Sequence, residues 1–232
     1  MKKMTMGKTS KQNFITYAMV IVVYVIFQTL SATGNLSSLM QGLLVPLCTY
    51  SILAVSLNLT VGVLGELSLG HAGFMCVGAF SSAFFTACMK DTITNDLLRF
   101  ILAFIVAAVC AGICGILIGI PVLRLKGDYL AIVTLAFGEI IMNIINALYI
   151  GRDENGFHFS MKDSMSLNMS DSGKIIIKGA QGITGTARQS TFAIGIILLL
   201  LTLVVVLNLM NSRSGRAIMS IRDNRIAAES VG

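Results

Sequence analysis

The chain has 232 residues, of which 55% are hydrophobic and only 12% are charged, and its mean hydropathy is +0.83. Soluble domains carry about 25% charged residues, so this composition excludes a typical soluble protein and indicates an integral membrane protein. The net charge of +6 does not indicate a nucleic-acid partner, because the basic residues lie at the ends of apolar segments, where they set membrane topology.

The apolar segments predict an all-α, polytopic helical bundle. A membrane span needs about 20 mostly apolar residues, and such stretches lie at 14–31, 39–64, 72–89, 98–121, 129–150 and 191–210. We expect about six spans, one or more of them interrupted or re-entrant, between an N-terminal tail at 1–13 and a final segment at 211–232. Pro46 removes a backbone donor and predicts a kink near the start of the second span. The third segment is short enough to be a half-helix.

The basic residues predict that both ends of the chain are cytoplasmic. With the N-terminus inside, ten Lys and Arg residues fall on the inner side and seven on the outer side, in line with the positive-inside rule. The apolar run at 14–31 is longer than the roughly 7–15 residues of a cleaved signal peptide. We interpret it as an uncleaved first span, the alternative being a cleaved leader that ends near Ala32.

The stretch from Ser56 to Phe80 departs from a simple lipid-facing helix. Five glycines interrupt it, and it also contains Glu66, Ser68 and His71. Glycine weakens a helix by roughly 1 kcal/mol relative to alanine. In a bilayer, broken backbone and ionisable groups are tolerated only against protein or a watery cavity. We predict a helix break at Gly70–Gly73 and a place for this stretch in the lining of a transport path. His71 would be either a hydrogen-bonded structural residue or a proton relay.

The fourth span carries a small residue at every fourth position: Ala103, Ala107, Ala111, Gly115 and Gly119. In lipid, such a stripe lets a second helix approach closely. We expect a packing seam inside the subunit, the alternative being an interface between subunits. The five cysteines lie within or at the ends of apolar runs, which favours small packing residues over metal or redox chemistry.

The fifth span contains Glu139 near its middle, where an acidic residue costs of order 3 kcal/mol on insertion scales. Asn143 and Asn146 follow on the same helical face. We expect this polar stripe to point inward, either lining a substrate path or forming a hydrogen-bonded latch between helices. The loop at 151–190 is too long for a simple connection. Residues 174–185 predict a short strand and a turn, and the loop is either a docking surface for an outside partner or a mobile segment.

The sequence becomes amphipathic after residue 210. Ser214 is positioned to cap a helix that carries Ala217 and Ile218, and Asp223 or Asn224 to cap a second piece. These pieces would lie on lipid headgroups or insert into a groove of a soluble partner.

Four stretches of the chain resemble the M-type (LivM-like) permease subunit of bacterial branched-chain amino acid ABC importers. They are LNLTVGVLGELSLGHAGFMCVGAF, LRLKGDYLAIVTLAFGEII, KGAQGITG and SGRAIMSIRDNRIAAESVG, with matching order and spacing, within residues 57–232. The resemblance implies a multi-pass protein of the bacterial plasma membrane that forms a translocation path with a second permease. Two cytoplasmic ATPase subunits would drive transport, and an extracytoplasmic binding protein would deliver branched-chain or related hydrophobic amino acids.

In this interpretation two sets of residues carry the function. The path residues that we single out are Ser68, Gly70, His71, Gly73, Glu139 and Asn143, with the substrate carboxylate held by amides at the broken-helix N-terminus. The resemblance implies an ATPase-coupling segment that contains Gly215, Arg216, Arg222, Ala227, Ala228, Glu229 and Gly232. The chain has no GxxxxGK[ST] loop, so we expect no enzyme activity and no cofactor in it, ATP being bound by the partner subunits.

The chain departs from the family pattern in two places. The third motif reads GAQGI at 179–183, where the family has a pattern closer to GGP-x-G, and the chain ends at Gly232, where relatives continue with further spans. The second departure predicts a fragment, the alternative being a shortened member of the family. Related permeases carry urea or short amides, which are alternative cargoes. The rival class is an ion- or proton-coupled secondary transporter that uses Glu139, Asp128 and Glu66, although no inverted repeat is visible.

Overall fold

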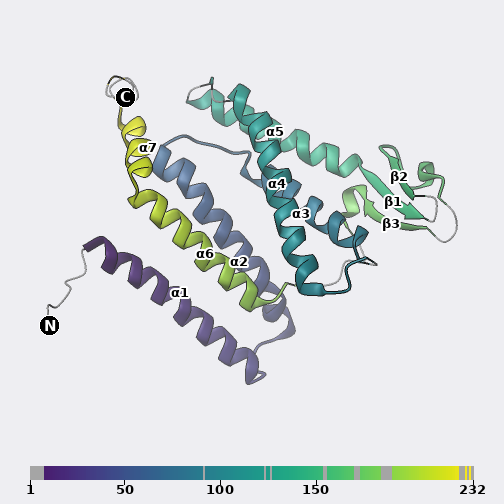
Figure 1. Cartoon of the computed structure of the whole chain (residues 1–232), viewed down its shortest axis with the longest axis horizontal. Coiled ribbons are helices and arrows are strands. Elements are labelled where there is room, and N and C mark those ends of the chain that lie inside the picture. Colours follow the sequence, from purple (N-terminus) through teal and green to yellow (C-terminus); the bar gives the residue numbers. More distant parts are fainter. Residues whose placement is uncertain are drawn as a thin grey trace. The chain divides into compact units, whose positions relative to one another are not determined.

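The protein consists mainly of long apolar helices (Figure 1). The structure is a computed structural model that describes residues 8–90, 92–122, 124–125, 127–153, 156–169, 173–183, 190–224, 228 and 230. Its principal helices are α1 (Lys8–Ala32), α2 (Ser38–Asn58), the π-helical turn η1 (Leu59–Leu64), α3 (His71–Cys88), α4 (Asp96–Val122), α5 (Asp128–Ala147), α6 (Phe192–Asn211) and α7 (Arg213–Asp223). With α2 and η1 counted together, six of the described helices are long and apolar enough to cross a membrane. The predicted polytopic helical fold is confirmed.

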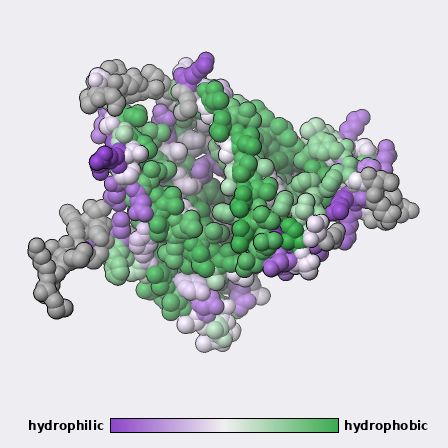
Figure 2. Space-filling model, viewed as in Figure 1, coloured by the Kyte–Doolittle hydropathy of each residue, from purple (hydrophilic) through white to green (hydrophobic). Residues whose placement is uncertain are grey.

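Large apolar side chains on these helices are exposed. In α4, for example, Ile116 is 65% exposed and Leu117 is 68% exposed. Figure 2 shows hydrophobic residues over the middle of the helices and hydrophilic ones toward the edges of the view, including the region of the strands. Lipid tails are as apolar as leucine side chains, so faces of this kind need no protein cover in a bilayer.

The chain divides into two compact units, which we describe separately. The first joins Met1–Glu66 to Ser190–Gly232 and contains α1, α2, η1, α6 and α7. Its core is formed by Cys48 of α2 with Ile196, Leu199 and Leu203 of α6. The two helices approach closely at Gly195, which has no Cβ. A Cβ there would lie only 2.9 Å from the Cβ of Cys48. Pro46 lies within α2, and the kink expected there stays a prediction.

The second unit, Leu67–Gln189, contains α3, α4, α5 and a small antiparallel sheet. Ile118 and Val122 of α4 and Leu130 of α5 form its helical core, with Phe74 of α3 packed against them. The strands β1 (Tyr149–Asp153), β2 (Gly156–Ser160) and β3 (Lys174–Lys178) pair in the order β2-β1-β3.

The sheet is attached to the end of α3. Ile176 and Ile177 of β3 pack with Cys88, the last residue of α3. Arg152 of β1 donates a hydrogen bond from Nη1 to the carbonyl oxygen of Cys88 at 2.9 Å. The guanidinium therefore satisfies one of the unpaired carbonyls at this helix end.

The strands and the end of α5 can be compared with the prediction. The short strand expected within 174–185 is confirmed as β3, but β1 and β2 were not expected. The fifth span, predicted at 129–150, is too long, because α5 ends at Ala147 and β1 begins at Tyr149. The described part of the loop at 151–190 therefore contains most of a three-stranded sheet and two short 3-10 turns.

Candidate functional site

A break in the helical chain separates η1 from α3. The π-helical turn η1 is a form that occurs frequently at functional sites. It ends at Gly65, whose φ of +79° is a left-handed conformation that glycine adopts without strain. Residues 65–70 are not helical, and α3 begins at His71. The break predicted at Gly70–Gly73 is therefore placed too late, because Gly73 lies inside α3.

Arg222 of α7 lies against this break within the first unit. Its Nη1 donates a hydrogen bond to the carbonyl oxygen of Gly62 at 3.1 Å. The last four carbonyls of a helix have no partner within the helix, so the guanidinium satisfies one of them and places a positive charge at the helix end. A Cβ on Gly65 would lie 2.6 Å from Cγ of Arg222. Gly65 thus provides both the left-handed turn and the space for the arginine side chain.

The connection between α6 and α7 is a tight turn around Ser212 and Gly215. The hydroxyl oxygen of Ser212 accepts a hydrogen bond from the backbone N–H of Gly215 at 3.0 Å and so caps α7. Gly215 is buried, and a Cβ there would lie 2.1 Å from the carbonyl oxygen of Leu209. The predicted cap at Ser214 is wrong, because α7 begins at Arg213 and Ser214 lies in its first turn.

The two faces of α7 differ in exposure. Gly215, Ile218 and Met219 are buried or half-buried, whereas the opposite face is exposed and includes Arg213, Arg216, Ala217, Ser220 and Ile221. Arg222, on the side of Gly215, is also exposed. Of the predicted coupling residues, Gly215 therefore lies on the inner face and Arg216 on the outer face, while Ala228 is half-buried. Ala227, Glu229 and Gly232 lie outside the described residues, as does most of the predicted second piece.

In the second unit, the start of α3 is fastened to α5. The backbone N–H of Leu69 donates to Oγ1 of Thr134 at 3.0 Å, and the Thr134 hydroxyl donates to the carbonyl oxygen of Ala131 at 3.0 Å. Thr134 is only 7% exposed. A Cβ on Gly70, the residue that precedes α3, would lie 2.5 Å from the carbonyl oxygen of Thr134. Glycine is therefore required for this backbone approach.

The same close contact continues one turn further along α3. A Cβ on Gly73 would lie 3.1 Å from Cδ1 of Ile141 and 3.2 Å from Cα of Gly138. Small residues allow such approaches between helices in a membrane. Gly70 and Gly73 thus lie in a tight contact between α3 and α5, and Ser68 and His71, which flank Gly70 in the sequence, are half-buried.

The polar stripe of α5 lies on the other side of that helix. Glu139, Asn143 and Asn146 are exposed, whereas Thr134 and Ile145 on the opposite face are buried. Within the second unit the stripe therefore faces away from the contact with α3. Its inward orientation stays a prediction about a larger assembly.

Small residues of α4 lie opposite α3. A Cβ on Gly78 of α3 would lie 3.9 Å from the Cβ of Ala111 and 4.0 Å from that of Ala107, and a Cβ on Gly115 would lie 3.9 Å from Cε1 of Phe74. Ala103 is 4% exposed. Among the described residues, no atom lies within 4 Å of a Cβ placed on Gly119.

The structure adds residues that the sequence did not single out, namely Thr134, Gly138 and Ser212. Thr134 and Gly138 are four residues apart on one helical face, and this small-residue spacing was an available signal for a close helix contact. All five cysteines are free. Among the described residues, no group of three His, Cys, Asp or Glu side chains is placed to hold a metal ion.

Comparison with known proteins identifies the family. A profile of the family described as "Branched-chain amino acid transport system / permease component" matches residues 39–232. The chain belongs to this permease family. Two curated relatives, both named "High-affinity branched-chain amino acid transport system permease protein LivM", come from Escherichia coli and Salmonella typhimurium. They are 30% and 29% identical to this chain over 97% of its length.

The chain spans about half the length of these curated relatives, 52% in each case. No solved structure matches it significantly. Membership of the branched-chain amino acid permease family agrees with the six helices that can cross a membrane. The chain is therefore a multi-pass membrane protein of a permease family, and both curated relatives are named as permease proteins.

Proposed function

We propose that this permease is a subunit of an ATP-driven importer for branched-chain or related hydrophobic amino acids in a bacterial plasma membrane. It forms the translocation path with a second permease and receives substrate from an extracytoplasmic binding protein. Two cytoplasmic ATPase subunits bind the ATP and dock on residues 211–232.

The contact between α7 and the helix break carries this proposal. The inner face of α7 reaches η1 through Arg222, while the outer face leaves Arg216, Ala217 and Ile221 exposed. A helix with one face on a spanning helix and an exposed, partly apolar face can insert into a groove of a second protein. Movement of that protein would then act directly on the conformation at Gly62 and Gly65.

The second support for the proposal comes from α5. Glu139 lies within a helix long enough to span the membrane, yet it is exposed in this chain. An acidic group that faces lipid costs about 3 kcal/mol at the centre of a span. In the assembled importer Glu139 and Asn143 therefore border water or another protein, and we propose that they line the path beside Ser68 and His71.

The two regions are joined by residues 65–70. A conformational change at Gly65 is passed along this short non-helical segment to Leu69, which is hydrogen-bonded to Thr134 of α5. In the proposed mechanism, ATP binding moves α7, alters the break, and so changes the access of the path from one side of the membrane to the other.

The test of ATPase coupling is association with the ATPase subunits of the proposed importer. Ile221→Glu places a charge on the exposed apolar part of α7, and we expect it to weaken co-purification at least tenfold. Gln12→Glu adds the same charge at another exposed position and is the matched control. Equal recovery of the ATPases with both variants would contradict the proposed docking face.

Uptake in proteoliposomes tests the energy source. We expect uptake of leucine-type substrates to require internal ATP and to persist when a protonophore removes the proton gradient. Uptake that stops with the protonophore while ATP is maintained would show that the chain is a proton-coupled transporter.

A further inference from the structure

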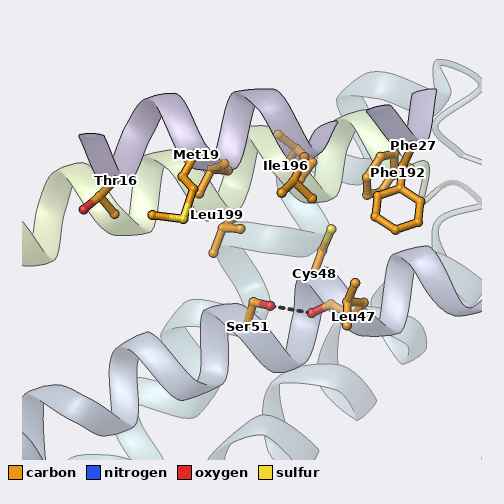
Figure 3. Close-up of a pocket in the computed structure, with 11 residues that line it drawn as sticks. Thr16, Met19, Phe27, Leu47, Cys48, Ser51, Phe192, Ile196 and Leu199 are labelled. Carbon is orange, nitrogen blue, oxygen red and sulfur yellow. Dashed lines mark hydrogen bonds between the residues drawn. The ribbon is translucent and has the colours of Figure 1, made fainter. Parts of the chain in front are cut away.

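The first unit contains a cavity for which the proposed transport mechanism has no use. It has a volume of about 250 Å³ and lies between α1, α2 and α6 (Figure 3). Thr16 and Met19 of α1 lie toward one end, Phe27 and Phe192 lie at the other, and Leu199 lies between them. All three helices that form it are long and apolar enough to span a membrane.

The cavity offers no free polar group. Its two hydroxyl-bearing residues bond to their own helices: Oγ1 of Thr16 donates to the carbonyl oxygen of Gln12 at 3.1 Å, and Oγ of Ser51 donates to that of Leu47 at 2.8 Å (Figure 3). The rest of the lining is aliphatic, aromatic or sulfur-containing. A water molecule needs two to four polar partners in such a site, and a polar substrate needs at least one. The cavity therefore suits an apolar ligand.

The lining residues of α1 extend over a distance similar to the length of one lipid acyl chain. Thr16 and Phe27 are about 17 Å apart along α1 at about 1.5 Å per residue, and half of a hydrocarbon core about 30 Å thick is about 15 Å. Three aromatic rings gather at one end, where the ring centroids of Tyr24 and Phe27 lie 5.5 and 6.4 Å from that of Phe192. Beyond the opposite end, α1 continues to the exposed Lys11, which suits a lipid phosphate.

We propose that this cavity binds one acyl chain of a bilayer phospholipid, with its methyl end against Phe192 and its headgroup toward Lys11. The bound chain fills the space between α1 and the tightly packed pair of α2 and α6. The lipid is thus a structural ligand that holds the first helix on the rest of this unit.

The proposal is tested by photolabelling in vesicles of phosphatidylethanolamine and phosphatidylglycerol that contain a phospholipid with a diazirine in the middle of its acyl chain. The whole chain is reconstituted, irradiated and mapped by mass spectrometry. Cys48 and Leu199 are the reporters, since they line the cavity but are only 3% and 8% exposed. Leu117 of α4, which is 68% exposed, reports ordinary contact with lipid. We expect label at all three residues.

Two variants fill the cavity from different helices. Ser51→Phe and Val23→Phe each place a ring among the lining residues, and we expect at least a fivefold loss of label at Cys48 and Leu199 with no change at Leu117. Val22→Phe adds the same ring at a neighbouring position that is 55% exposed and outside the lining, and it should leave all labelling unchanged. Should one filling variant fail to fold, the other still provides the comparison.

Two results would overturn the proposal. If Cys48 and Leu199 stay unlabelled in the unaltered chain while Leu117 is labelled, a protein segment or a second copy fills the cavity. If both filling variants keep the full label, the label comes from elsewhere than the cavity. Neither result depends on ATPases or substrate, so this test stands apart from that of the transport function.

Discussion

The guanidinium of Arg222 donates a hydrogen bond to the carbonyl oxygen of Gly62, 3.1 Å away and 160 residues earlier in the chain. This contact joins a short amphipathic helix to the point where a spanning helix leaves its regular geometry. The end of η1 can keep its present hydrogen bonding only while α7 stays in place. The same arginine side chain occupies the space that a Cβ on Gly65 would need.

Replacing Arg222 should uncouple ATP hydrolysis from transport. Arg222→Ala removes a charged hydrogen bond, which contributes about 1 kcal/mol at a partly exposed position after solvent screening. That changes the equilibrium constant between the docked and released positions of α7 by roughly fivefold. We expect the number of ATP molecules hydrolysed per substrate transported to rise several-fold in proteoliposomes, with partial recovery in Arg222→Lys.

A variant of the outer face provides the contrast. Arg216→Ala should weaken association with the ATPases, since Arg216 is exposed on the side of α7 that faces away from η1. Among complexes that do form, the ratio of ATP hydrolysed to substrate transported should be unchanged. If Arg222→Ala and Arg216→Ala have the same effect on both readouts, the distinction between the two faces is incorrect.

Gly65→Ala should destabilise the permease by about 1–3 kcal/mol, because alanine is strained at a positive φ. Gly42→Ala is the matched control in the same segment, since a Cβ there has no atom within 4 Å among the described residues. It should be neutral or stabilise the helix by up to about 1 kcal/mol. The measurement is the free energy of unfolding in detergent, followed by circular dichroism.

The part of the strain that comes from Arg222 can be separated by a double-mutant cycle. In the Arg222→Ala background, Gly65→Ala no longer meets Cγ of the arginine, so its cost should fall by at least about 0.5 kcal/mol. Strict additivity of the two substitutions would mean that the cost comes only from the backbone conformation.

Thr134 should stabilise the start of α3 through its hydroxyl. Thr134→Val keeps the shape of the side chain but leaves the N–H of Leu69 without its acceptor, and this should cost about 1–3 kcal/mol. Thr134→Ser retains the oxygen and should cost less than half as much. Hydrogen exchange at the Leu69 amide, measured in detergent, should accelerate in the valine variant only. Equal exchange rates in both variants would exclude this hydrogen bond as the cause.

Hydropathy was sufficient to predict the spanning helices, because burial in lipid requires long apolar segments whatever their neighbours are. It placed the end of the fifth span incorrectly for the same reason. Tyr149 and Ile150 extend the apolar run, yet they form β1 because β2 and β3 supply antiparallel partners. The Asn155-Gly156 dipeptide between the first two strands was an available turn signal, but hydropathy alone does not register it.

The candidate site was predicted in outline only. The glycine-rich composition indicated a break, but its position depends on the left-handed conformation of Gly65 and on an arginine that arrives from a distant segment. Thr134 was missed, since a threonine in an apolar helix usually bonds to its own backbone. Thr134 does so to Ala131, and only the packing of α3 against α5 reveals its second role as an acceptor for Leu69.

Glu139 provides the test of where the transport path runs. It is exposed and lies opposite the face of α5 that packs on α3, so Glu139→Leu should change the stability of this chain by no more than about 0.5 kcal/mol. Uptake by the assembled importer should nevertheless fall at least tenfold, because the carboxylate is lost from the proposed lining. Met142→Leu, at a position on the same helix that is 46% exposed, should leave uptake unchanged. If Glu139→Leu instead destabilises the isolated chain while uptake per folded complex is kept, the carboxylate is a structural latch and the path runs along another face.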